Sequence, residues 1–118
     1  MKRIISIIII ALGIMPLWAQ NDYCIKQAQS YQREAEYYTK QALGYEREVD
    51  YYNRQAQRYL REAEYYSKRK NYDSVKTYQI RAKNATEKAE SYARKARNAR
   101  ERAQGYMRKA EYALKRAK

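Results

Sequence analysis

The fold is decided by residues 27–68, which read QAQSYQREAEYYTK, QALGYEREVDYYNR and QAQRYLREAEYYSK in three successive stretches of fourteen. Small residues and tyrosines alternate along this segment at spacings of three and four, which is the heptad spacing of a coiled-coil helix. Small residues take every a position and tyrosines every d position. In chain order these seam residues are Ala28, Tyr31, Ala35, Tyr38, Ala42, Tyr45, Val49, Tyr52, Ala56, Tyr59, Ala63 and Tyr66. The pattern predicts a long helix whose Ala/Tyr stripe packs against another helix.

A second heptad pattern begins at Val75, after the first is lost in the polar segment 68–74. It continues through Tyr78, Ala82, Ala85, Ala89, Tyr92, Ala96, Ala99, Ala103, Tyr106, Ala110, Ala113 and Ala117. We therefore expect a helix over about 22–69, a turn over about 70–73, and a helix over about 74–117 capped by Asp73 or Ser74. Two helices of similar length joined by a short turn predict an all-α fold, a long antiparallel two-helix hairpin.

The register of this hairpin follows from the seam. Centring the turn near residues 70–71 places large residues opposite small ones, so that Tyr59 faces Ala82 and Ala63 faces Tyr78. This alternation fills a seam without voids. In the same register three glutamates of the first helix approach three bases of the second, in the pairs Glu62–Arg81, Glu48–Lys95 and Glu34–Lys109. Exposed pairs of this kind contribute only about 0.2–1 kcal/mol each, and we expect them to select the antiparallel orientation.

Three further tyrosines, Tyr37, Tyr51 and Tyr65, flank the seam of the first helix. A two-helix layer covers only one face of each helix, and alanine buries little apolar area. We therefore expect either a marginally stable monomer or a homo-oligomer, in which the hairpins self-associate into a four-helix arrangement.

Residues 1–19 have the features of a secretory signal peptide. Lys2 and Arg3 precede a short apolar run, Pro16 interrupts it, and Ala19 offers a small residue for cleavage. The run is shorter than the roughly 20 apolar residues that span a bilayer. We therefore expect cleavage and an exported chain, residues 20–118, that is secreted or periplasmic; retention of the segment as an anchor is the alternative. A glutamine directly after the cleavage site resembles exported bacterial proteins, which implies a bacterial origin.

The single cysteine, Cys24, has no partner of its own kind within the chain. In an oxidising compartment two interpretations stay open for it. The first is an intermolecular disulfide that joins two chains near their N-termini, and the second is an exposed thiol with no role.

The net charge of +13 is unevenly distributed. Residues 22–66 carry 7 bases and 8 acids, whereas residues 67–118 carry 17 bases and 5 acids. Such a charge attracts polyanions without reading a sequence, and DNA, acidic glycans and lipid phosphates fit equally well. The predicted polyanion-binding residues are Arg94, Lys95, Arg97, Arg100, Arg108, Lys109 and Lys115. The second helix offers mainly alanine as an apolar face, so we expect no deep membrane insertion.

The alternative function is a structural or protein–protein interaction rod. Four tyrosines outside the seam, Tyr37, Tyr51, Tyr65 and Tyr112, would then contact the partner. A third reading of the charge is that lysine and arginine only keep an exported rod in solution.

Enzymatic activity has the least support. The chain has no histidine, and its glycines do not form a phosphate-binding loop. Its carboxylates lie among bases without the spacing of a metal site. We therefore expect no catalytic residues, no cofactor, no metal and no small-molecule substrate.

Overall fold

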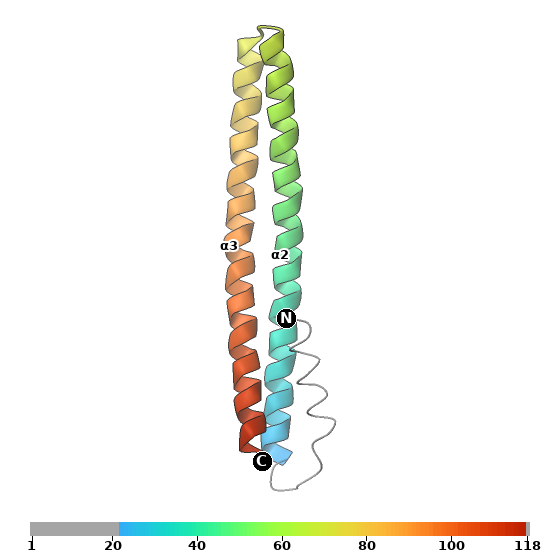
Figure 1. Ribbon diagram of the computed structural model, residues 1–118, viewed down its shortest axis with the longest axis vertical. Coiled ribbons are helices and arrows are strands. Elements are labelled where there is room, and N and C mark those ends of the chain that lie inside the picture. Colours follow the sequence, from blue (N-terminus) through green and yellow to red (C-terminus); the bar gives the residue numbers. More distant parts are fainter. Residues whose placement is uncertain (1–21, 118) are drawn as a thin grey trace. The chain divides into compact units, whose positions relative to one another are not determined.

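The computed structural model describes residues 22–117, and these form two α-helices joined by a tight turn (Figure 1). Helix α2 spans Asp22–Lys68 and helix α3 spans Tyr72–Arg116. The predicted all-α antiparallel hairpin is therefore confirmed. The predicted signal peptide at residues 1–19 lies outside the described residues.

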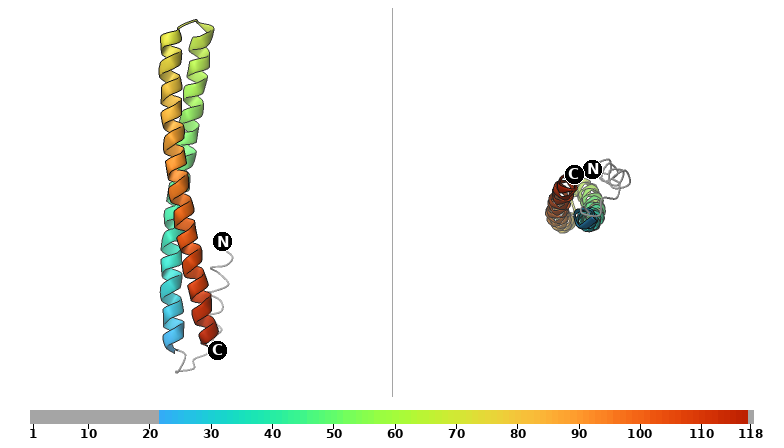
Figure 2. Two further views of the ribbon diagram at one scale, coloured as in Figure 1. Left: turned by 90° about the vertical axis from the view of Figure 1, so that its left-hand side faces the viewer. Right: turned by 90° about the horizontal axis from the view of Figure 1, so that it is seen from below.

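The chain divides into two compact units, which we call the turn unit and the terminal unit. The turn unit comprises residues 42–97. The terminal unit comprises, among the described residues, 22–41 and 98–117. Within each unit a segment of α2 lies side by side with an antiparallel segment of α3, as Figure 1 and the left view of Figure 2 show together.

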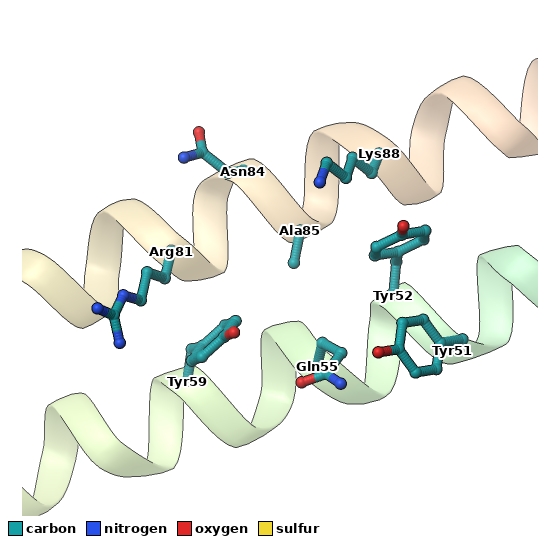
Figure 3. A pocket seen from close by; sticks show the side chains of 8 residues that line it. All are labelled: Tyr51, Tyr52, Gln55, Tyr59, Arg81, Asn84, Ala85 and Lys88. Carbon is teal, nitrogen blue, oxygen red and sulfur yellow. The ribbon is translucent and has the colours of Figure 1, made fainter.

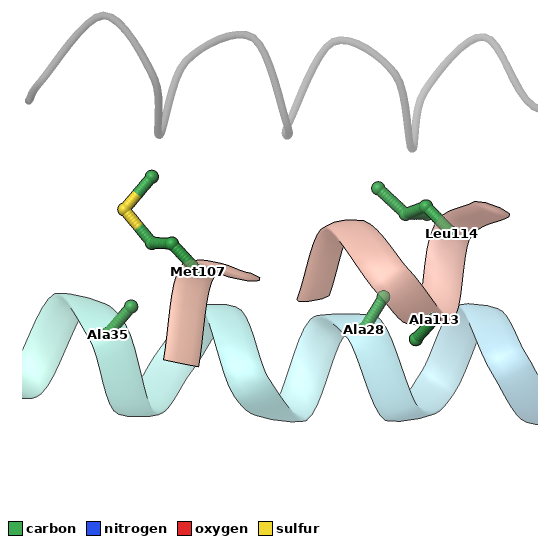
Figure 4. Close-up of a cluster of buried hydrophobic side chains, with 5 residues drawn as sticks. All are labelled: Ala28, Ala35, Met107, Ala113 and Leu114. Atoms are coloured by element: carbon green, nitrogen blue, oxygen red, sulfur yellow. The ribbon is translucent and has the colours of Figure 1, made fainter. Parts of the chain in front are cut away.

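The core of both units consists mainly of alanine methyl groups, and the described residues include no large side chain that is fully buried. In the terminal unit, Ala28 and Ala113 lie between the helices, whereas the side chains of Met107 and Leu114 point away from α2 (Figure 4). A buried methyl or methylene group contributes only about 0.8 kcal/mol. The apolar surface of the half-buried seam tyrosines must therefore supply much of the stability of the hairpin.

The turn is a Schellman motif followed directly by a helix cap. Lys70 adopts a left-handed conformation with φ of 59°. Its backbone N–H donates to the carbonyl oxygen of Ser67 at 3.0 Å, and the N–H of Asn71 donates to the carbonyl oxygen of Tyr66 at 3.0 Å. These two bonds satisfy carbonyl groups that the end of α2 would otherwise leave unpaired.

The N-cap residue of α3 is Asn71, so the prediction that Asp73 or Ser74 caps this helix was wrong. The Asn71 Oδ1 atom accepts a hydrogen bond from the backbone N–H of Ser74 at 3.3 Å, which is the contact of an N-cap residue. Helix α3 therefore begins at Tyr72, two residues before the predicted start. Asp73 instead lies in the first turn of α3, where a negative charge favours the helix dipole.

Replacing Lys70 by glycine should stabilise the hairpin, because glycine adopts the left-handed conformation without the steric cost of a side chain. We expect Lys70→Gly to raise the free energy of unfolding by about 0.5–1 kcal/mol in urea titrations followed by circular dichroism. Arg69→Gly is the matched control and should not stabilise the hairpin, because only Lys70 has a positive φ here. Equal stabilisation by both substitutions would contradict this account of the turn.

Candidate functional site

The seam tyrosines are gathered into clusters by a two-heptad repeat. In the turn unit, the ring of Tyr92 lies 5.8 Å from that of Tyr52, nearly parallel to it, and 6.1 Å from that of Tyr45. In the same unit, the ring of Tyr78 stacks on that of Tyr66 at 5.5 Å and lies tilted to that of Tyr59 at 6.2 Å. In the terminal unit, the ring of Tyr106 stacks on that of Tyr38 at 5.8 Å and lies tilted to that of Tyr31 at 6.1 Å.

The clusters agree with a register in which Tyr78 lies opposite Ala63, between Tyr59 and Tyr66. The ring contacts between tyrosines of the two helices were not predicted. A tyrosine ring on a helix points back along the helix axis. It therefore leaves its own layer and reaches the tyrosine of the facing helix in the neighbouring one.

A fourth tyrosine flanks each cluster at the edge of the seam. Tyr51 packs edge-on against Tyr52 at 5.1 Å, and Tyr65 packs in the same way against Tyr66. In the terminal unit, Tyr37 packs against Tyr38. About half of each flanking side chain is exposed, between 48 and 54%. These are three of the tyrosines predicted to contact a partner; the fourth, Tyr112, is 57% exposed.

The bases of α3 that border the seam lie over the tyrosine rings. In the turn unit, the cationic groups of Arg81, Lys88 and Lys95 lie 5.0–5.4 Å from the ring centres of Tyr78, Tyr52 and Tyr92. In the terminal unit, Arg102 lies over Tyr38, and Lys109 lies over both Tyr31 and Tyr106. Cation–π contacts of this length contribute about 0.5–1 kcal/mol at exposed sites.

The predicted pairs Glu62–Arg81, Glu48–Lys95 and Glu34–Lys109 are not among the ion pairs found in the described part of the chain. The ion pairs found there join residues four apart within α2: Asp22–Lys26, Asp50–Arg54 and Glu64–Lys68. All are exposed and so contribute little stability. An aromatic ring brings no negative charge of its own, so these contacts add no carboxylate to offset the positive charge of the α3 bases.

A groove lies between the helices of the turn unit, beside the seam (Figure 3). Tyr51, Gln55 and Tyr59 contribute to it from α2, and Arg81 and Lys88 contribute from α3. Its volume is about 220 Å³. Among the described residues, the charged side chains that line it are these two cations, so the groove is suited to an anionic group. We call it the Gln55 groove.

The terminal unit has a similar groove of about 210 Å³, which also combines a glutamine, tyrosines and two bases. We call it the Gln27 groove; it is lined also by Tyr31, Lys109, Tyr112 and Arg116. Here the Arg116 guanidinium (Nη2) donates a hydrogen bond to Gln27 Oε1 at 2.6 Å. The Gln27 amide in turn donates to the hydroxyl of Tyr31 at 3.5 Å. The central glutamine of this groove is therefore hydrogen-bonded within the protein.

The predicted polyanion-binding residues lie on several faces of α3. Arg100 is half-buried. The other six are exposed: Arg94, Lys95, Arg97, Arg108, Lys109 and Lys115. Lys95 and Lys109 are the two that lie over rings. The prediction missed the groove residues Arg81, Lys88 and Arg116. A signal for them was present, since glutamine begins each fourteen-residue repeat at a position that faces a base of α3.

Cys24 lies in α2, where it is half-buried and forms no disulfide within the chain. The intermolecular disulfide remains a prediction. Among residues 22–117 no group of histidine, cysteine and carboxylate side chains is arranged to hold a metal ion. Within the same residues neither helix has an apolar stretch long enough to cross a membrane.

Comparison of the chain with protein-family models, with curated proteins and with solved structures finds no match. The functional argument therefore rests on the residues and geometry described above.

The tyrosine clusters should dominate the stability of the hairpin. We expect Tyr92→Ala, which removes two ring contacts, to lower the free energy of unfolding by about 2–3 kcal/mol. The matched control is Tyr112→Ala on the same helix, which removes an exposed ring and should cost less than about 1 kcal/mol. Urea unfolding of both variants provides the measurement. Similar losses for the two would show that the clusters are not the main source of stability.

Proposed function

We propose that the protein attaches electrostatically to a polyanion or to an anionic cell-envelope surface, with α3 as the binding element. The observation that carries this proposal is the charge of the two helices. Helix α3 has 13 bases and 5 acids, whereas α2 has 8 of each. A surface of one sign concentrates ions of the other sign and speeds their association.

The cation–π contacts support the proposal in a second way. A long lysine or arginine side chain normally loses rotamer freedom when it binds a ligand, which weakens binding. Arg81, Lys88 and Lys95 already lie over rings in the turn unit. Part of their entropy is therefore lost on folding, and less remains to be lost on binding.

The expected export of the chain bears on the partner. If residues 1–19 direct secretion, the polyanion is one that is found outside the cytoplasm. Extracellular DNA, an acidic glycan and lipid phosphates of an envelope surface are the three candidates, and all share a dense row of negative charges.

The proposal predicts binding to heparin or DNA that weakens as salt rises, because association releases condensed counterions. The triple variant Arg94→Glu, Arg97→Glu, Arg108→Glu reverses three exposed charges of α3 and should reduce affinity by more than about tenfold at low salt. Affinity is measured by titration at several salt concentrations.

The matched control is Arg33→Glu, Arg47→Glu, Arg61→Glu, which makes the same change in net charge at exposed positions of α2. We expect a clearly smaller loss from it. Equal losses would assign the attraction to net charge rather than to α3, and an absence of salt-dependent binding by the unmodified protein would overturn the proposal.

The exposed tyrosines favour a second function, a protein–protein interaction or self-association through α2. Tyr51 and Tyr65 are fourteen residues apart in the turn unit, which puts them on one face about 21 Å apart along α2. Tyrosine is enriched in protein interfaces because its ring buries a large area at a small entropic cost. In this alternative the hairpins form the four-helix homo-oligomer, with these tyrosines at the contact.

Self-association makes the melting temperature depend on protein concentration. We expect the melting temperature of the unmodified protein to rise with concentration, and that of Tyr51→Ser, Tyr65→Ser to stay constant. Tyr72→Ser, which removes a tyrosine that is 67% exposed at the start of α3, is the control and should keep the dependence. A melting temperature that is constant for the unmodified protein would contradict the alternative.

A further inference from the structure

The side-chain oxygen of Gln55 is buried in the turn-unit groove and accepts no hydrogen bond from the described residues. Most buried polar atoms in folded proteins have a hydrogen-bond partner, and an unpaired one destabilises the fold. A donor from outside the protein, either a water molecule or a ligand hydroxyl, would remove this destabilisation.

The Gln27 groove shows how the protein can supply such a donor itself. There the partner of the glutamine oxygen is the guanidinium of Arg116. The base that faces Gln55 in the same register is Lys88, and its ammonium lies over the ring of Tyr52. In the Gln55 groove, therefore, no donor of the described residues occupies the acceptor, and the two cations and the exposed Tyr51 ring line the opening above it.

The chemistry of this groove favours a sugar acid over a nucleic acid. A DNA phosphodiester offers only acceptor oxygens, so it can contact Arg81 and Lys88 but cannot donate to Gln55. Proteins that bind single strands, RNA included, stack the bases on open aromatic faces. Tyr52 is already stacked on Tyr92 and covered by Lys88, and Tyr59 lies under Arg58. Of the groove tyrosines this leaves Tyr51 with an open face, which is one platform rather than the series on which successive bases stack.

The size of the groove points the same way. Pockets for drug-sized ligands measure roughly 300–1,000 Å³. The Gln55 groove, at about 220 Å³, is smaller than these. It therefore suits a single unit of a polymer, and an acidic sugar offers an anionic group and hydroxyl donors on one ring.

We propose that the Gln55 groove is a subsite for an acidic sugar residue of a polymeric glycan. The anionic group of the sugar lies against Arg81 and Lys88, and Tyr51 covers one side of the sugar ring. The partly exposed Gln55 side chain turns its Oε1 atom into the groove, where one sugar hydroxyl donates a hydrogen bond to it. This inference rests on the proposed polyanion attachment and names the class of polyanion.

The test compares heparin oligosaccharides with a DNA duplex of equal charge, at one fixed ionic strength. Gln55→Leu removes the acceptor and should weaken heparin binding by about three- to tenfold, the effect of one lost hydrogen bond, while DNA binding stays the same. The variant should unfold at the same or a higher temperature, because it removes an unpaired buried oxygen. The matched control is Gln57→Leu at an exposed position two residues away, which should leave heparin binding unchanged.

A second variant separates the groove from charge alone. Lys88→Arg keeps the charge and is expected to supply the donor that Arg116 supplies to Gln27, so it should weaken heparin binding several-fold and leave DNA binding unchanged. If the groove attracts anions by charge alone, arginine will bind both polymers at least as well as lysine.

The outcomes distinguish this inference from the proposed function. Equal loss of heparin and DNA binding in Gln55→Leu would overturn the sugar assignment in favour of a general anion groove. Unchanged heparin binding in both groove variants, with salt-dependent binding retained, would overturn the subsite and leave polyanion attachment standing. An unmodified protein that binds neither polymer would overturn both.

Discussion

The packing of the tyrosine rings depends on the small size of the alanines that are buried between the two helices. Within each unit, buried alanines of α2 and α3 place little more than methyl groups between the two helices. Helices with small contact residues can approach closely, and a tyrosine ring then has no space inside its own layer. The rings lie along the seam instead, where the ring of Tyr92 reaches that of Tyr52 and the flanking Tyr51 packs against its edge. The α3 cations over Tyr78, Tyr52 and Tyr92 follow from the same arrangement, because these ring faces are turned to the bases beside the seam.

Much of the fold could be predicted from the sequence because the heptad pattern is nearly unbroken on both helices. The break at residues 68–74 indicated the hairpin, and the alternation of large and small residues indicated the register. The cap was missed because Asn71, Asp73 and Ser74 are all good caps, and only the left-handed conformation at Lys70 decides which one begins α3. The tyrosine contacts were missed because pairing by layers assumes that a side chain stays in the layer of its own backbone.

The candidate site was less predictable, for an energetic reason. An exposed base such as Lys95 gains about as much from a ring as from a carboxylate, below or near 1 kcal/mol in either case, so spacing cannot rank the two partners. The structure places Lys95 over Tyr92, while Asp50 and Glu64 pair with bases of their own helix. This choice of partner has a functional consequence. A base and its carboxylate partner together present little net charge, whereas a base held over a neutral ring is positioned with its positive charge not offset by that partner.

The glutamines at the start of the repeats differ in whether their side-chain oxygen has a hydrogen-bond partner, and among the described residues Gln55 is the one whose buried oxygen lacks it. A glutamate at Gln55 would face Lys88 in this register and would give the hairpin an additional orienting pair. Glutamine gives up that attraction and leaves an oxygen buried without a partner, at a destabilisation of about 1–3 kcal/mol. In the Gln27 groove an arginine donates a hydrogen bond to the glutamine oxygen and removes this destabilisation. At Gln55 the facing base is a lysine that lies over Tyr52 instead. Departures from local consistency of this kind are expected where a protein binds something, because the missing partner is then the ligand.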